Sequence, residues 1–239
     1  METVVWAHRG SSFIAPENTL ESFDLAAKQN ADGIELDIHL TSDGQLAVFH
    51  DETLERTTNG TGLVEGCTMS QLKQLDAGVL RPKYAGAKIP TLPEVLDFVQ
   101  GTSLRLNIEI KEEKLPDPEL VKQLAKLIRD FDLVERTMYC SFNHYSLMGL
   151  RTVMPDACIG LLYHGGLVKP WIYAQSIGAD CLHPFFRFGL INGQVKNAHK
   201  AGLKVNVWTV DEPDDMRWVY EQGADGIITN KPDIALQLR

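Results

Sequence analysis

Short apolar runs alternate with amphipathic segments along almost the whole chain. Apolar runs of this length are typical of strands buried on both faces of a sheet. They predict eight strands, at residues 4–7, 33–37, 104–110, 138–141, 158–162, 180–183, 204–208 and 226–229. Apolar residues at helical spacing predict eight helices between them, at residues 19–29, 92–99, 118–131, 144–154, 170–177, 192–201, 213–222 and 232–238.

Polar residues and glycines support several of these helix ends. Asn18 with Glu21, and Thr91 with Glu94, have the spacing of a capping box, which satisfies the first free amides of a helix. Glycines follow three predicted helix ends, where a left-handed backbone is favoured: Gly178, Gly202 and Gly223.

Alternating strands and helices predict parallel strands joined by right-handed crossovers. Closed on itself, such a chain is an α/β protein of the (β/α)8 TIM-barrel class, and an open doubly wound sheet is the alternative. Residues 51–90 are too few for a domain and too many for a loop, and they contain a short helical piece at 70–75. We expect a single TIM-barrel domain over residues 1–239, with 51–90 as a small insertion after strand 2.

Three acidic residues interrupt the apolar strands. Glu35 and Asp37 alternate with Ile34 and Leu36, and Glu109 has the same setting in another strand. Residues two apart point to one face of a strand, so Glu35 and Asp37 project side by side. A half-exposed antiparallel sheet would leave them in water, but both faces of a barrel sheet are covered.

Clustered carboxylates away from water raise each other's pKa and are costly unless a cation compensates them. Oxygen ligands suit Ca²⁺ or Mg²⁺, and spacing does not separate the two. Zinc fits less well, because His8 and His50 lack helix-style ligand spacing and no thiolate joins them. We therefore expect one divalent cation, Ca²⁺ or Mg²⁺, at the three carboxylates.

Active sites of this fold lie at the carboxyl ends of the strands. The predicted strand ends would bring these residues to one mouth: His8 and Arg9, Glu35 and Asp37, Glu109 and Lys111, then Ser141, His183, Trp208 and Asn230.

Each polar residue at this mouth has a chemical and a structural interpretation. His8 and His50 suit acid/base catalysis or simple packing, and Asp51 could orient His50 or open a turn. Arg9 suits phosphate binding through its planar fork, or a salt bridge at the rim. Two further residues leave the same choice: Lys111 as a second positive charge or a solvated strand end, and Trp208 as a pocket wall or an interior aromatic.

Composition and charge limit the classes of binding partner. The 239 residues are 44% hydrophobic and carry a net charge of −9 without a basic run, which argues against nucleic acid or an anionic membrane. No apolar stretch has the length of a membrane span, and we expect no secretory signal at the N-terminus. The four cysteines lack Cys-x-x-Cys spacing and indicate a reducing compartment, so we expect a cytoplasmic protein.

Taken together, these motifs resemble the glycerophosphodiester phosphodiesterase family, and the length resembles its short cytosolic bacterial members. Any one motif is weak, but they follow family order along nearly the whole chain. The matching pieces are Ala7-His-Arg-Gly10, Pro16-Glu-Asn-Thr19, Glu35-Leu-Asp37 with Leu40-Thr-Ser-Asp-Gly44, His50-Asp51, Arg56-Thr-Thr58, Ile89-Pro-Thr-Leu92, Asn107-Ile-Glu-Ile-Lys111, Val207-Trp-Thr209, Gly223-Ala-Asp-Gly226 and Thr229-Asn-Lys-Pro232.

The resemblance implies a phosphodiesterase that converts small glycerophosphodiesters, such as glycerophosphocholine or glycerophosphoethanolamine, to sn-glycerol 3-phosphate and an alcohol. A hydroxyl of the substrate would attack phosphorus and leave a cyclic phosphate that water opens. The implied roles are general acid and base for His8 and His50, phosphate binding for Arg9 with Lys111 nearby, and one divalent cation on Glu35, Asp37 and Glu109.

Three other readings remain open. A lysophospholipase D-like or sphingomyelinase-D-like activity on the same barrel would need an apolar groove or a membrane-facing loop. A catalytically idle binding protein would not need the intact set of histidines and acids. A metal-dependent barrel of the amidohydrolase kind would want more histidine ligands. The head group and the oligomeric state are open.

Overall fold

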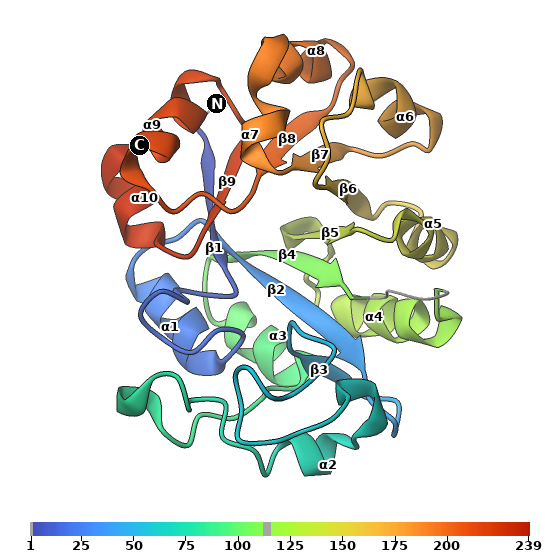
Figure 1. Cartoon of the computed structure of the whole chain (residues 1–239). Coiled ribbons are helices and arrows are strands. Elements are labelled where there is room, and N and C mark those ends of the chain that lie inside the picture. The colour runs from blue at the N-terminus through green and yellow to red at the C-terminus, as the bar shows by residue number, and fades with distance from the viewer. Residues whose placement is uncertain (1, 112–115) are drawn as a thin grey trace.

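The computed structural model describes residues 2–111 and 116–239 (Figure 1). Within these ranges eight parallel strands close into a ring, because β1 pairs with β9 on one side and with β2 on the other. The predicted (β/α)8 barrel is therefore confirmed. Its strands are β1 (Val4–His8), β2 (Gly33–Leu40), β4 (Arg105–Ile110), β5 (Thr137–Ser141), β6 (Cys158–Tyr163), β7 (Cys181–Pro184), β8 (Lys204–Val207) and β9 (Gly226–Thr229).

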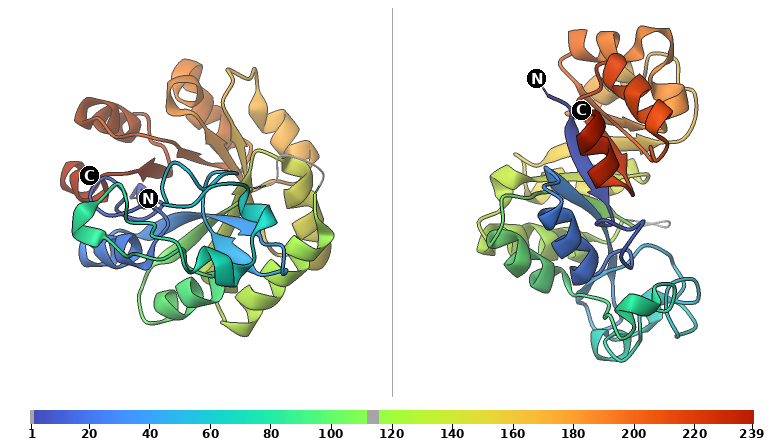
Figure 2. Two further views of the ribbon diagram at one scale, coloured as in Figure 1. Left: turned by 60° about the horizontal axis from the view of Figure 1, so that its bottom comes forward. Right: turned by 90° about the vertical axis from the view of Figure 1, so that its left-hand side faces the viewer.

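The helices surround this ring (Figures 1 and 2). They are α1 (Leu20–Lys28), α3 (Leu92–Gln100), α4 (Pro118–Asp130), α5 (His144–Val153), α6 (Pro170–Ser176), α8 (Gln194–Lys200), α9 (Pro213–Glu221) and α10 (Pro232–Leu238), each where the sequence predicted a helix. The short α7 (Phe186–Gly189) and the 3₁₀ turns η3 (Val134–Arg136) and η4 (Ile191–Gly193) lie in the connections.

The main core lies between the ring and these helices. Ile34, Leu36 and Ile38 belong to it and are fully buried. Since side chains alternate along a strand, Glu35 and Asp37 take the opposite direction, into the barrel. The predicted parity of β2 thus separates an apolar outer face from a carboxylate-bearing inner face.

The insertion predicted at residues 51–90 lies outside the ring, beside β2 (Figure 1, cyan to green). It contains η1 (Val64–Gly66), α2 (Met69–Leu72) and η2 (Pro82–Tyr84), and α2 overlaps the predicted helical piece at 70–75. A second, smaller core holds it together: Ala47, Phe49, Leu54, Val64, Met69, Leu72, Ala77 and Ile89. The division of residues 1–239 into one domain with this insertion stays a prediction.

Two local predictions were wrong. The second strand does not end at Asp37; it continues to Leu40 and pairs antiparallel with β3 (Leu46–Val48), a strand too short to show periodicity. Helix α1 is capped by Thr19 and Ser22 rather than by Asn18 and Glu21. Asn18 has a left-handed backbone, with φ of 55°, and its side-chain amide binds Asp37 instead.

The other end signals are confirmed. Thr91 and Glu94 form the predicted capping box of α3. Gly178, Gly202 and Gly223 have φ of 69°, 80° and 73°, the left-handed backbone expected after a helix. Among the described residues no helix has the length and apolarity that crossing a membrane requires.

Candidate active site

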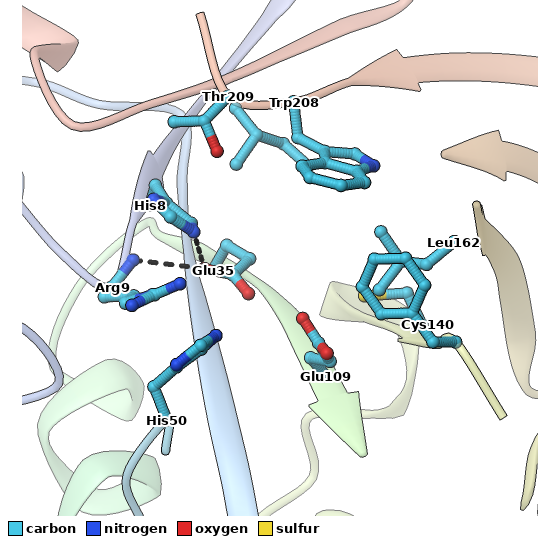
Figure 3. Close-up of a pocket in the computed structure, with 11 residues that line it drawn as sticks. His8, Arg9, Glu35, His50, Glu109, Cys140, Leu162, Trp208 and Thr209 are labelled. Carbon is cyan, nitrogen blue, oxygen red and sulfur yellow. Dashed lines mark hydrogen bonds and ion pairs between the residues drawn. The ribbon is translucent and has the colours of Figure 1, made fainter. Parts of the chain in front are cut away.

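Strand register brings the predicted site residues together at one end of the barrel. His8 is the partner of Glu35 across β1 and β2, and Asp37 is the partner of Glu109 across β2 and β4. A pocket opens there (Figure 3), lined by His8, Arg9, Glu35, His50, Glu109, Cys140, Phe142, Leu162, Trp208, Thr209 and Ile228.

Three carboxylates form the floor of this site. One oxygen from each of Glu35, Asp37 and Glu109 lies within 4.8 Å of the other two, and all three residues are buried. In Figure 3 the carboxylates of Glu35 and Glu109 lie close together and point toward one another. Oδ1 of Asp37 is buried and has no hydrogen-bond partner among the described residues.

Burial and mutual repulsion disfavour full ionisation of the cluster. Burial and the Asp37 charge raise the pKa of Glu35 well above its usual value, and the same two causes raise the pKa of Glu109 to about 7. Although burial opposes it, the neighbouring Arg9 and Lys111 hold the pKa of Asp37 low. An all-oxygen donor set, in which Oδ1 of Asp37 accepts no hydrogen bond from the described residues and lies 3.8 Å from Nζ of Lys111, fits a hard divalent cation such as Ca²⁺ or Mg²⁺.

His8, at the end of β1, is oriented by an amide. Its Nδ1 lies 2.7 Å from Oδ1 of Asn230, whose Nδ2 donates to Asp211 at 2.6 Å. That amide orientation makes Nδ1 of His8 the donor, so Nε2 has a free lone pair, 3.9 Å from Oε2 of Glu35. Burial and the Arg9 charge lower the pKa of His8 to about 4.

His50, which follows β3, is oriented by a carboxylate. Its Nδ1 lies 2.6 Å from Oδ1 of Asp51, and its Nε2 lies 3.2 Å from Nζ of Lys111. Burial lowers the pKa of His50, against the opposing charge of Asp37 and the hydrogen bond to Asp51. Of the two roles that the sequence allowed for Asp51, the structure shows the orienting one.

Two positively charged side chains, Arg9 and Lys111, flank the carboxylates. Arg9, with φ of 57°, donates its amide to Oε2 of Glu35 at 3.1 Å, and its Nε lies 3.5 Å from Oδ2 of Asp37. Lys111 donates to Oε1 of Glu109 at 2.8 Å. Both positive groups therefore face the cluster, and Lys111 is not a solvated strand end.

The opposite wall of the pocket is apolar. Trp208 donates its indole N–H to the carbonyl of His183 at 2.7 Å and meets Phe142 edge-to-face, with ring centroids 5.4 Å apart. Phe185 lies against Trp208 at 5.8 Å and stacks on His164 at 4.8 Å. Of the two positions that the sequence left open for Trp208, a pocket wall or the barrel interior, the structure shows the pocket wall.

Two strand-end residues do not reach the pocket. His183 is fully buried and its Nε2 lies 3.0 Å from Nδ2 of Asn206. Ser141 donates its hydroxyl to the carbonyl of Ile110 at 2.7 Å. Both residues lie at the end of the barrel that carries the pocket, as predicted, but their hydrogen bonds hold neighbouring strands and not a ligand.

A family model decides what this arrangement belongs to. The model described as the glycerophosphoryl diester phosphodiesterase family matches residues 8–234. The chain belongs to this family. The resemblance stated from the sequence motifs is thereby confirmed.

Relatives of the family agree over their full length. A glycerophosphodiester phosphodiesterase of Caldanaerobacter subterraneus is 45% identical over 239 residues, which cover 100% of this chain and 98% of that protein. One of Bacillus altitudinis is 37% identical, over 99% of this chain and 98% of that protein. The prediction that the chain is an enzyme of this kind, a phosphoric diester hydrolase, is confirmed.

Solved structures of the family share the barrel. The crystal structure of a glycerophosphodiester phosphodiesterase from Agrobacterium tumefaciens has a TM-score of 0.86 at 33% identity, covering 99% of this chain and 100% of that one. A phosphodiesterase of Oleispira antarctica, in complex with the product sn-glycerol-3-phosphate, has a TM-score of 0.90 at 30% identity, covering 98% of this chain and 96% of that one.

Proposed function

We propose that the chain hydrolyses small glycerophosphodiesters, such as glycerophosphocholine and glycerophosphoethanolamine, to sn-glycerol 3-phosphate and an alcohol. One observation carries the proposal: two histidines with different partners face a buried carboxylate cluster that two cations flank. The product bound to the Oleispira antarctica relative supports the glycerol phosphate half of the substrate.

Glu35, Asp37 and Glu109 would hold one Ca²⁺ or Mg²⁺. Such a cation, when bound, neutralises phosphate charge and stabilises the charge that develops in the transition state. Arg9 and Lys111 complete the positive lining, and the planar fork of Arg9 suits phosphate oxygens. Trp208, on the apolar wall, would contact the organic part of the substrate.

The hydrogen-bond partners of the two histidines indicate their roles in the first step, in which the substrate hydroxyl attacks phosphorus. An amide oxygen orients neutral His8 and leaves Nε2 as an acceptor, so His8 takes the proton of the attacking hydroxyl. His50 rests neutral, with Nδ1 donating to Asp51 and Nε2 accepting from Lys111, and the Asp51 carboxylate would stabilise the imidazolium that forms when Nε2 takes up a proton. His50 would therefore carry that proton to the leaving alcohol. The roles reverse when water opens the cyclic phosphate.

The cyclising route separates this mechanism from direct attack by water. An analogue that lacks the hydroxyl next to the phosphoester carbon should still bind, since Arg9 and Lys111 would contact its phosphate, but should scarcely react. The natural substrate should release a transient cyclic glycerol phosphate, visible by phosphorus NMR early in turnover. Hydrolysis of the deoxy analogue at nearly the parent rate would leave water as the nucleophile.

One observation favours a second candidate, a lysophospholipase D-like activity. Exposed apolar side chains lie on the loops that follow β5, β6 and β7, next to the aromatic wall: Phe142, Leu167, Val168, Phe188 and Ile191. A monoacyl chain could lie over them. Release of choline from a short-chain lysophosphatidylcholine at a kcat/KM above that for glycerophosphocholine would establish this candidate as the main activity.

A further inference from the structure

A single guanidinium outside the pocket joins two carboxylates. Arg56, in the insertion, donates from Nε and Nη2 to Oδ2 and Oδ1 of Asp51 at 2.5 and 2.9 Å. It also donates from Nη1 and Nη2 to Oε2 and Oε1 of Glu17, both at 2.7 Å. Each carboxylate thus receives a pair of hydrogen bonds from the same planar fork, the strongest geometry for such pairs.

Both carboxylates continue into the site. Asp51 binds Nδ1 of His50 at 2.6 Å, and Glu17 accepts from Nη1 of Arg9 at 2.9 Å. His50 and Arg9 line the pocket, whereas Arg56 does not. Arg56 is therefore linked through Asp51 to His50, a proposed acid, and through Glu17 to Arg9, a proposed phosphate ligand.

Arg56 favours the ionised form of both carboxylates and fixes their orientation. Burial opposes ionisation, but hydrogen bonds from Arg56 and His50 hold the pKa of Asp51 at about 2, and those from Arg56 and Arg9 lower the pKa of Glu17. An ionised Asp51 only accepts hydrogen bonds, so it fixes the proton of His50 on Nδ1. Glu17 likewise fixes the guanidinium of Arg9 by accepting from its Nη1, while the Nε of the same group lies 3.5 Å from Oδ2 of Asp37.

We infer that Arg56 is a positioning residue for the reaction: through Asp51 it sets the tautomer and orientation of His50, and through Glu17 it sets the direction of Arg9. The inference rests on the proposed function for the roles of His50 and Arg9. It gives the insertion a part in catalysis, because the residue that ties both groups together comes from it.

The competing explanation is that Arg56 only fastens the insertion to the barrel. The chain offers a matched control for that role. Arg81, also in the insertion, donates from Nη2 to the carbonyls of Ser12 and Phe13, both at 3.1 Å, and within the described part of the chain it makes no hydrogen bond to a residue of the pocket lining. Arg81→Ala removes an equivalent fastening and leaves the two carboxylate links in place.

Kinetics of Arg56→Ala, Arg56→Lys and Arg81→Ala on glycerophosphocholine test the inference. Both Arg56 variants should lose kcat by about 10–100-fold, the range for groups that orient a site residue through hydrogen bonds, and should raise KM. Lysine keeps the charge but lacks the fork, so it should not rescue. Arg81→Ala should keep kcat and KM within about twofold of wild type, even if its melting temperature falls as far as that of Arg56→Ala.

Two measurements keep the test decisive. In a double-variant cycle, Arg56→Ala should lower kcat by a smaller factor in an Asp51→Asn background than in wild type, because the part of its effect that passes through Asp51 is already lost. The remaining loss passes through Glu17 and Arg9. The nitrogen NMR signals of His50 should show one tautomer in wild type and in Arg81→Ala but a mixture in Arg56→Ala. This signature needs no turnover, so it tests the link even if another substrate is the true one.

Unchanged His50 signals together with wild-type kcat and KM in Arg56→Ala would overturn the inference. So would equal kinetic losses in Arg81→Ala, because they would show that fastening the insertion is what matters.

Discussion

At the scale of single residues, the carboxylates and the histidines of the site should fail in different ways. Glu35, Asp37 and Glu109 are the proposed ligands of one cation. Changing any of them to Ala should abolish activity and weaken metal binding together, measured by turnover and by calorimetric titration with Ca²⁺ and Mg²⁺. Chelator should inactivate the wild type, and one of these cations should restore it. Tight metal binding with normal turnover in Glu35→Ala would contradict the assignment.

Loss of a histidine should remove rate but not metal. His8→Ala and His50→Ala should each lower kcat by roughly 10²–10⁴-fold, as expected for a positioned acid or base, while the metal still binds. His199→Ala is a matched control, because His199 pairs with Asp225 at 2.7 Å on the exposed surface as His50 pairs with Asp51. A histidine whose removal also releases the metal belongs among its ligands instead.

Strand parity and the barrel fold were enough to predict which charged residues meet, but not what holds them. Glu35, Asp37 and Glu109 follow from alternation along two strands. The bonds that orient the site residues join positions far apart along the chain: Arg56 and Glu17, behind Arg9, are 39 positions apart, and His8 and Asn230 are 222 apart. No periodicity records such pairs, so the sequence could not specify them.

At the scale of elements, long-range partners overrode local signals. The Asn18–Glu21 spacing is a good capping signal, but Asn18 donates to the buried carboxylate of Asp37 at 2.8 Å. A buried charge left without that donor costs more than a helix cap contributes, so Thr19 caps the helix instead. The Thr91–Glu94 signal was right, because the long-range partner of Glu94, Lys73, binds a carboxylate oxygen that still accepts from Thr91.

Two glycines offer a paired prediction about the elements that carry them. A Cβ on Gly160, in β6, would lie 2.4 Å from the ring of buried His183, whereas one on Gly149, in α5, would meet nothing within 4 Å. Gly160→Ala should therefore lower the free energy of unfolding by about 1–3 kcal/mol through overpacking. Gly149→Ala should raise it by about 1 kcal/mol, since alanine favours a helix interior. Denaturant titrations of both variants measure the difference; equal effects would contradict the packing argument.

At the scale of the whole molecule, the two halves of the ring supply different surfaces. The charged residues come from β1, β2, β4 and the segment after β3, while the aromatic wall comes from the ends of β5 to β8. Figure 3 shows this division, with Arg9 and His50 facing Trp208 and Leu162 across the pocket. A phosphodiester carries an organic group on each side of its phosphate, so a substrate whose phosphate meets the charged half can place one of its two organic groups against the apolar wall.

The described residues form a main core, a core in the insertion and a small third cluster of Trp6, Met138, Cys181 and Ile228. How the insertion core is coupled to the barrel bears on the predicted single domain over residues 1–239. The insertion core shares Ala47 with β3, and Arg56 and Arg81 bind the barrel from the insertion. A core of this size cannot offset the chain entropy of 40 residues alone, so residues 51–90 should unfold with the barrel. Denaturant unfolding followed by far-UV circular dichroism and by tryptophan fluorescence should give one coincident transition. An earlier transition confined to the insertion, seen as faster amide exchange at Leu54 and Leu72 than at Ile34, would show that the insertion unfolds separately.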